Sequence, residues 1–241
     1  DRQKAIKRFN PLIKYLGKEL KIPCTLVIPE SDSHALKLFH DGKLDLVNFG
    51  GFAFVKAYMS SQAIPLVMRE IDSRRLSYFI KKADHPGKNL ADFKGKTLSF
   101  SSRLSTSGHL MPRYYLKKQG IIPETFFKKV LYSGNHDKTA YWLRDGKVDL
   151  GVMDSQVFDR MLRDKLLQKQ VLKVIFRTPP YPDNVWAIHP GVNSHTGKKL
   201  KDAFLNLSIK NIDHKKILDG LGAKHYIEAN VETYKDLAKI I

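Results

Sequence analysis

The chain has 241 residues, of which 42% are hydrophobic and 27% charged, proportions typical of a globular protein with a hydrophobic core. Its 42 lysine and arginine residues outnumber 24 acidic ones, and the resulting net charge of +18 favours anionic partners. No stretch approaches the ~20 apolar residues of a membrane helix, and a single cysteine excludes an internal disulfide.

Helical and strand patterns alternate along the chain. Apolar residues at helical spacing predict a first helix over residues 5–20, and the β-branched stretch 24–29 predicts a strand. The stretch 32–43 predicts a helix that ends before Gly42, and a strand over 44–51 follows it. Further strands are predicted over 76–82, 97–102, 128–134, 148–154, 171–178 and 185–190, with helices over 107–120, 136–147 and near the C-terminus. This alternation predicts an α/β protein with mainly parallel sheets and helices on their faces.

Two segments share one pattern. FHDGKLDLVNFG (39–50) and LRDGKVDLGVMD (143–154) both contain Asp-Gly-Lys-x-Asp-Leu, 104 residues apart. In each, a helix ends, a glycine supplies a left-handed turn, and a strand begins. The repeat predicts two lobes of similar plan, lobe 1 over 1–82 plus 181–241 and lobe 2 over 83–180. Two extended crossings, near 82–86 and 177–182, would form a hinge of the kind that closes on a ligand.

Polar residues follow several of the predicted strands. In open α/β sheets the ligand lies beyond the C-terminal ends of the strands, and there the sequence places Asn48, Ser101, Ser133 and Asp154 with their neighbours. The stretch SSRLSTSGHLMPRYYL (101–116) leads from a strand directly into a helix. A helix start has unpaired N–H groups and a positive dipole end, so it suits an anion.

Three hydroxyl residues and a glycine stand at this helix start. Ser105, Thr106 and Ser107 would supply three hydroxyl donors, and Gly108 would let a ligand approach the backbone. A helix cap needs one such hydroxyl. The residues alone leave two interpretations open, a helix cap and an oxyanion site.

Several segments resemble one protein family. They are RFNPLIKYLGKEL, GKLDLVNFGGFAFVKAY, LADFKGKTLSFSSRLSTSG, STSGHLMPRYYLKKQGI, SGNHDK and PPYPDNVWAI. In this order they resemble the substrate-binding proteins of phosphonate, phosphite and phosphate ABC transporters, the PhnD-like family of type 2 periplasmic binding proteins. The resemblance covers most of the chain. It implies two α/β lobes joined by a two-crossing hinge, with the ligand in the cleft.

The resemblance also implies ligand-binding residues. The hydroxyls of Ser105, Thr106 and Ser107, with the amides from Gly108 on, would hold the phosphorus oxyanion. His136 matches the histidine of the family's Gly-x-His turn and would donate to the same anion; otherwise it is a surface histidine in a first helical turn.

In the first lobe, Phe49 and Gly50, with the glycine that follows, match an aromatic-glycine ligand loop. Phe49 stands where tyrosine is common, so a phenolic hydrogen bond would be lost.

Other positions depart from the family pattern. Arg75 replaces a common tyrosine and would either pair with the oxyanion or face solvent. Gln156 stands where some members carry an acidic partner for a ligand amine, with Asp154 and Ser155 beside it. An aminoalkyl phosphonate would then lack its ammonium partner unless Asp154 or Asp183 replaced it.

Three further residues lie in the PPYPDNVWAI segment. Asp183 would accept a hydrogen bond from a protonated oxyanion, or would be a turn aspartate. Tyr181 and Trp186 are interpreted as pocket wall or core.

These features favour binding over catalysis. The sequence has no Gly-x-Ser-x-Gly and no His-Glu-x-x-His motif, and a Ser107–His136 couple lacks a third group, so we expect no catalytic residues, cofactor or metal. Basic residues are spread as pairs along amphipathic segments, so no nucleic-acid partner is expected. The expected partners are a small oxyanion (phosphonate, phosphite or phosphate) and a membrane protein, either an ABC permease or a receptor kinase in which the module is a sensor.

Two expectations concern the whole protein. The resemblance implies a periplasmic or extracytoplasmic location, as a secreted, lipid-anchored or receptor-borne module. The family's plan also starts with a strand before its first helix, whereas this sequence opens with a helical pattern. We therefore expect the precursor to continue upstream of Asp1, or another chain or segment to fill that strand's place.

Overall fold

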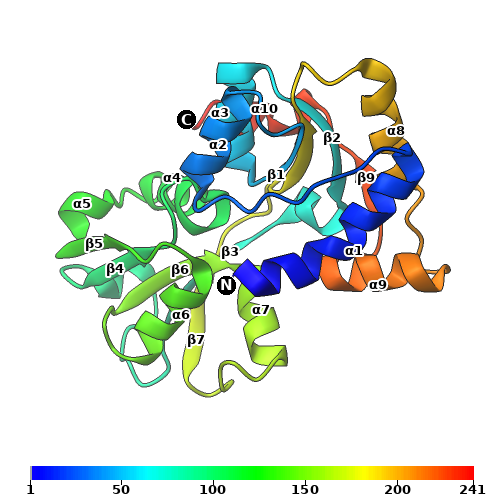
Figure 1. Cartoon of the computed structure of the whole chain (residues 1–241). Helices are drawn as coiled ribbons and strands as arrows, with labels where there is room; N and C mark the ends of the chain where they lie inside the picture. The colour runs from blue at the N-terminus through cyan, green and yellow to red at the C-terminus, as the bar shows by residue number, and fades with distance from the viewer. Residues whose placement is uncertain (1) are drawn as a thin grey trace. The chain divides into compact units, whose positions relative to one another are not determined.

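The computed structural model describes residues 2–241, which form two compact units (Figure 1). The first unit runs up to Arg74 and resumes over Pro182–Lys239, and the second comprises Arg75–Tyr181 with Ile240–Ile241. The chain therefore crosses between the units at residues 74–75 and 181–182. The predicted boundary placed residues 75–82 in the first lobe, but their strand hydrogen-bonds to strands of the second unit.

The first unit is built on a four-stranded sheet with the order β1-β8-β2-β9. Its strands are β1 (Leu46–Phe49), β2 (Ile64–Arg69), β8 (Val185–Ile188) and β9 (Tyr226–Glu228). Every neighbouring pair in this order is antiparallel. β1 and β2 both run opposite to β8, so they are parallel to each other but not adjacent. The prediction of a mainly parallel sheet is wrong here. β8, which belongs to the segment that resumes after the second unit, lies between β1 and β2.

Helices cover this sheet and supply most of its core. α1 (Arg2–Leu20) packs against α8 (Ser194–Leu205) and α9 (Ile212–Leu221), and α8 packs against β2 and β9 (Figure 1). Buried residues of all three helices and of the sheet form one hydrophobic cluster. Leu12, Leu16 and Leu20 recur every four residues, so they share one face of α1 and are buried. The remaining helical elements of this unit are α2 (Asp32–His40), α3 (Gly51–Ser61), α10 (Lys235–Ala238) and the 3-10 turns η1 (Glu70–Arg74) and η4 (Val231–Tyr234).

The prediction of a strand over residues 24–29 is wrong. The side chains of Cys24, Leu26 and Ile28 are half-buried and those of Thr25 and Val27 exposed, the alternation of a strand. Yet the backbone of this segment makes no backbone hydrogen bond to any other residue in the range 2–241. It is extended chain without a neighbouring strand.

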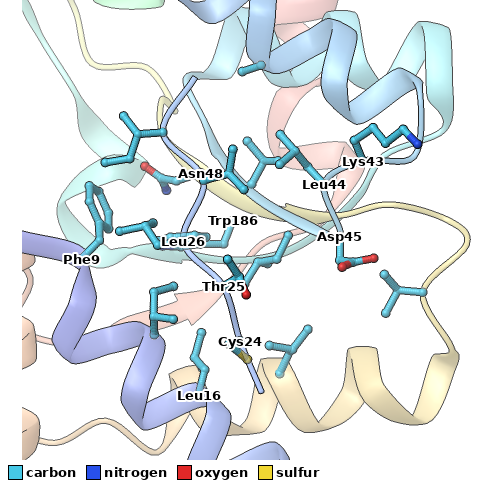
Figure 2. A pocket seen from close by; sticks show the side chains of 18 of the residues that line it. Phe9, Leu16, Cys24, Thr25, Leu26, Lys43, Leu44, Asp45, Asn48 and Trp186 are labelled. Atoms are coloured by element: carbon cyan, nitrogen blue, oxygen red, sulfur yellow. The ribbon is translucent and has the colours of Figure 1, made fainter. Parts of the chain in front are cut away.

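A cavity of about 780 Å³ lies between this segment and β1. Figure 2 shows Phe9, Leu16, Leu26 and Trp186 around it. β1 is an edge strand of its sheet, and the expectation of a further strand stays a prediction.

The second unit contains a five-stranded sheet with the order β5-β4-β6-β3-β7. Its strands are β3 (Ser77–Lys82), β4 (Thr97–Phe100), β5 (Lys129–Tyr132), β6 (Leu150–Asp154) and β7 (Leu172–Arg177). β4 is parallel to β5 and β6, whereas β3 is antiparallel to β6 and β7. The prediction of parallel strands is confirmed for the three strands that helices connect.

Both faces of this second sheet are buried. Phe79 and Val152 belong to one hydrophobic cluster, while their sequence neighbours Ile80 and Met153 belong to the other. Alternate residues of a strand point to opposite faces, so continuous apolar runs are needed to cover both. The helical elements are α4 (Met111–Lys118), α5 (Pro123–Phe126), α6 (His136–Arg144), α7 (Ser155–Arg163), the 3-10 turn η2 (Leu90–Phe93) and the π-helical turn η3 (Thr106–Leu110).

The repeated Asp-Gly-Lys pattern folds the same way in both units. Gly42 has φ +65° after α2, and Gly146 has φ +69° after α6. The following lysine N–H donates back to the helix in each case, from Lys43 to Leu38 O and from Lys147 to Trp142 O, both at 2.8 Å. These hydrogen bonds end each helix and turn the chain into β1 or β6. The predicted joints are confirmed.

Candidate functional site

The polar residues of the second unit gather at one edge of its sheet. β4, β5 and β6 are parallel neighbours, so their C-terminal ends lie on the same side. Ser101 follows β4, Ser133 follows β5, and Asp154 ends β6. Each strand end is followed by a helical segment, η3 with α4, α6 and α7. Three helix starts with positive dipole ends therefore meet at this edge.

A proline shapes the first of these helix starts. In a regular α-helix, the carbonyl of Gly108 would accept from residue 112, but Pro112 has no N–H. The Gly108 carbonyl instead accepts from the Ser101 N–H at 2.9 Å. The turn widens to a π-helical one, in which the Leu110 N–H reaches back to Ser105 O at 3.0 Å. Gly108 and Pro112 together attach the helix start to the end of β4.

The three hydroxyl residues have different roles. The Ser105 Oγ accepts from the Gly108 N–H at 2.8 Å and is the helix cap. Thr106 and Ser107 follow it inside the turn and are buried, with 1% and 3% of their surface exposed. One hydroxyl is therefore enough for capping, as the sequence suggested. The other two remain candidates for an anion.

Gly108 lies against side chains of its own unit. A Cβ atom at this position would lie 2.5 Å from the Ser101 Oγ and 2.9 Å from the His136 Cε1. We expected the glycine to give a ligand access to the backbone. In the structure, it makes room for Ser101 and His136, so the three strand ends can approach closely.

His136 begins α6 and points its ring at the other two strand ends. Its Nδ1 lies 2.8 Å from the Ser101 Oγ and accepts from the Asp154 N–H at 3.2 Å. A backbone N–H can only donate, so Nδ1 carries no proton in this arrangement. The proton of the neutral ring is then on Nε2, which makes this edge of His136 a hydrogen-bond donor.

Arg75 and Asp154 form a buried ion pair. The Arg75 Nη1 donates to the Asp154 Oδ1 at 3.2 Å, and each side chain is only 5% exposed. The same Oδ1 caps α7 by accepting from the Val157 N–H at 3.0 Å. Of the two expectations for Arg75, a solvent-facing guanidinium is wrong. Ser155 is buried beside Asp154, and its N–H donates to Leu76 O.

The predicted residues of the first unit gather at the start of α3. Asp183 is 3% exposed, and its Oδ1 accepts from the Gly51 N–H at 3.0 Å, so this aspartate caps the helix that Gly50 precedes. Phe49 is buried and packs edge to face against Phe39. Its ring therefore belongs to the core of the unit, and the nearby backbone of Gly50 leads into the helix start.

Two residues near these sites were not among the predicted ligand-binding residues. Ser101 is 1% exposed and links all three strand ends of the second unit, because Gly134 N donates to its carbonyl and its Oγ contacts His136 and Val152 O. In the first unit, Arg69 makes a two-pronged ion pair with Asp72. A serine directly after a buried strand was the signal for Ser101. Nothing in the sequence singles out Arg69.

Residues 2–241 offer neither a candidate metal cluster nor a candidate membrane-spanning helix. Residues 2–241 contain no cluster of three or more His, Cys, Asp or Glu side chains that could hold a metal ion. None of the helices in that range is both long and apolar enough to cross a membrane.

Comparison with known proteins identifies the family. Residues 1–234 match the family model described as the periplasmic phosphonate-binding protein of ABC transporters. The probable phosphite-binding protein PhnD1 of Prochlorococcus marinus MIT 9301 is 33% identical over 97% of this chain and 83% of its own length. The phosphate-import protein PhnD of Mycolicibacterium smegmatis is 26% identical over 88% of this chain and 70% of its own length.

A solved structure agrees with this match. PhnD1 of the same Prochlorococcus strain in complex with methylphosphonate has a TM-score of 0.94 and 31% identity, covering 100% of this chain and 93% of that chain. The fold is thus the two-lobe fold of type 2 periplasmic binding proteins, and these relatives are transport proteins rather than enzymes. The chain belongs to the family of periplasmic substrate-binding proteins that serve phosphonate ABC transporters.

Proposed function

We propose that the protein binds a small phosphorus oxyanion through the edge where β4, β5 and β6 end. The observation that carries this proposal is the network that joins three helix starts around Ser101 and His136. It presents the Nε2 proton of His136 and the buried hydroxyls of Thr106 and Ser107 in one unit. This arrangement is supported by four residues that surround it: Ser105, Gly108, Ser155 and Arg75. The methylphosphonate complex of PhnD1 supports the ligand class.

Gly50 and Asp183 are proposed to contribute from the first unit. The Gly50–Gly51 turn opens α3, and a helix start provides N–H donors. Asp183 fixes that turn through the Gly51 N–H, and an oxygen of its carboxylate could accept from a protonated oxyanion. Phe49 positions this turn by packing in the core. The net charge of +18 would speed capture of an anion.

The ligand is proposed to lack an amino group. The Asp154 carboxylate is held by Arg75 and by the α7 cap, and that of Asp183 accepts from the start of α3 and is proposed to accept from the oxyanion itself. Neither carboxylate is therefore proposed to pair with an ammonium group of the ligand. We expect phosphite, methylphosphonate or phosphate to bind at least about 10-fold more tightly than 2-aminoethylphosphonate, since one unpaired ammonium costs about 1.5 kcal/mol or more. Calorimetric titration with these four ligands and with sulfate measures the order of their affinities. If 2-aminoethylphosphonate binds most tightly, the proposal that the ligand lacks an amino group is contradicted.

The residue assignment has a direct test. Thr106→Val keeps the shape of a buried side chain and removes its hydroxyl, so we expect affinity for the best ligand to fall about 10- to 100-fold, the loss of one hydrogen bond to a charged group. Thr125→Val, on an exposed turn of the same unit, should bind as the wild type does. If both variants bind equally tightly, the oxyanion lies elsewhere.

The biological role follows from the family. We infer that the loaded protein delivers its ligand to the membrane permease of an ABC transporter, outside the cytoplasmic membrane, as a secreted or lipid-anchored protein. A pull-down of the membrane fraction with the ligand-saturated protein tests the partner. Recovery of a sensor kinase in place of a permease would support the alternative use of the module in a receptor.

A further inference from the structure

One histidine, His109, lies among aromatic and arginine side chains in the proposed oxyanion-binding turn. His109 belongs to η3, and its ring packs edge to face against Phe100 and Tyr132, with centroids 5.1 Å away in each case. Its Nδ1 lies 2.7 Å from the carbonyl oxygen of Arg103. On the other side of the ring, the Nε of Arg113 donates to Nε2 at 3.1 Å.

These two contacts fix the protonation of His109. A carbonyl oxygen can only accept a hydrogen bond, so Nδ1 carries a proton. A guanidinium can only donate, so Nε2 carries none. The ring is therefore neutral in this arrangement. Burial lowers the pKa of His109 from 6.5, and the charges of Arg113 and Arg103 lower it further, against the opposing effects of the Arg103 carbonyl and Glu124.

His109 ties down the loop that carries the proposed site. Residues 101–105 connect β4 to η3, and their turn is closed by Ser105 N donating to Ser102 O at 3.2 Å. The Nδ1–H of His109 holds the carbonyl of Arg103 in the middle of this loop. The Arg103 guanidinium lies 4.1 Å from the Tyr132 ring centroid, so the loop is held on the same cluster through both its backbone and a side chain.

We propose that neutral His109 is a positioning residue, which holds the 101–105 loop in the shape that presents Thr106 and Ser107, and that its protonation loosens this loop and weakens ligand binding. The effect on affinity rests on the function proposed above. The effect on the loop does not.

The groups around the ring determine what protonation does. Arg113 approaches from α4, Arg103 from the loop, Glu124 from α5 and Tyr132 from β5. Glu124 is already held by two hydrogen bonds from Arg113. A proton on Nε2 would face the Arg113 guanidinium and remove the acceptor that Arg113 and Tyr132 share. The ring would have to move, and its contact with Arg103 would be lost.

The sign of the pH effect follows from linkage. The binding-competent form is the one with neutral His109, and the pKa of this ring is below 6.5. Affinity is then complete above pH 6.5 and decreases as the pH falls through this lowered pKa. The fold responds in the same direction, because the unfolded chain binds this proton more readily than the folded protein does.

Two substitutions separate the effect of the hydrogen bond between His109 and the loop (the tether) from the effect of protonating His109. His109→Gln keeps a donor and an acceptor but does not titrate, and His109→Leu removes both. At pH 7.5 we expect His109→Gln to bind the best phosphorus ligand within about 3-fold of wild type and His109→Leu about 10-fold more weakly, the effect of about one hydrogen bond. Below pH 6.5, the wild type should lose affinity relative to His109→Gln. The titration of the ligand and of all other groups is common to both proteins and cancels.

Hydrogen exchange measures the loop without any ligand. Amides of residues 101–108 should exchange about 10-fold faster in His109→Leu than in wild type or His109→Gln. The exchange of wild type should approach that of His109→Leu as the pH falls through the lowered pKa of His109, after correction for the intrinsic rate. His195→Gln, an exposed change in α8, is the matched control.

The outcomes distinguish the two proposals. Equal loop exchange in wild type and His109→Leu would overturn the positioning role of His109. Parallel affinity profiles of wild type and His109→Gln from pH 7.5 down to the lowest pH at which both proteins remain folded would overturn the pH effect. If wild type binds none of the phosphorus oxyanions while the loop still responds to His109→Leu, the tether is supported and the proposed function is wrong.

Discussion

Gly108→Ala should abolish most ligand binding and destabilise the second unit. The new Cβ would lie 2.5 Å from both the Cβ and the Oγ of Ser101, a distance that real side chains do not adopt. Ser101 is 1% exposed and hydrogen-bonded on several sides, so it cannot move away freely. We expect a loss of about 2–3 kcal/mol in the free energy of unfolding from overpacking. Affinity for the phosphorus ligand should fall about 100-fold or more as His136 is displaced.

Denaturant unfolding and calorimetric titration measure the two effects. Gly220→Ala is the matched control, because a Cβ there meets nothing closer than 3.8 Å and the residue lies inside α9. That variant should be as stable as wild type or slightly more so, since alanine favours a helix by about 0.5–1 kcal/mol over glycine. A Gly108→Ala protein with wild-type stability and affinity would show that the three strand ends are not packed as described.

Arg75→Met should be among the most destabilising single changes in the second unit. It would leave the Asp154 carboxylate, 5% exposed, without its cationic partner. Breaking a buried ion pair by removing one partner costs about 3–5 kcal/mol. The free energy of unfolding should fall by that order, as measured by urea titration.

The second partner provides the decisive comparison. In Arg75→Met/Asp154→Asn no charge is left unpaired, and asparagine can still cap α7 by accepting from the Val157 N–H. We expect the double variant to be more stable than Arg75→Met by at least about 1 kcal/mol. Arg163→Met, at an exposed pair 3.7 Å from Asp164, should change stability by less than about 0.5 kcal/mol.

The same variants test whether Arg75 touches the ligand. A folded double variant that keeps its affinity would limit Arg75 to the support of Asp154. One that loses affinity about 10-fold or more would place a guanidinium donor on the anion. A double variant no more stable than Arg75→Met would contradict the ion-pair account, since a neutral pair should not incur the cost of an unpaired charge.

The local joints of the fold could be predicted from the sequence. Helix and strand periodicities located most elements, and the two Asp-Gly-Lys joints were predicted because only glycine readily adopts the left-handed turn found at Gly42 and Gly146. The run Ser105–Gly108 marked a helix start for another reason: a short hydroxyl side chain can accept a hydrogen bond from an unpaired N–H group there. The resemblance of these motifs then supplied the family and the ligand class.

Strand neighbours could not be predicted in this way. The sequence of residues 24–29 has every local property of a strand, but a strand requires a hydrogen-bonding partner, and no backbone group within residues 2–241 hydrogen-bonds to this segment. Likewise, β8 and β3 run antiparallel to their neighbours because the chain crosses twice between the units. Pairing depends on residues far apart in the chain, so local periodicity carries no information about it.

By itself, the sequence determined where helices begin, which residues offer hydroxyls and amides to an anion, and to which family the chain is similar. Only the tertiary structure decided how those groups are used. It showed that Ser105 is the cap, that Gly108 makes room for Ser101 and His136, and that Arg75 is paired with Asp154. A hydrogen bond or ion pair is a property of two groups in space, and the second group in each of these cases comes from another part of the chain.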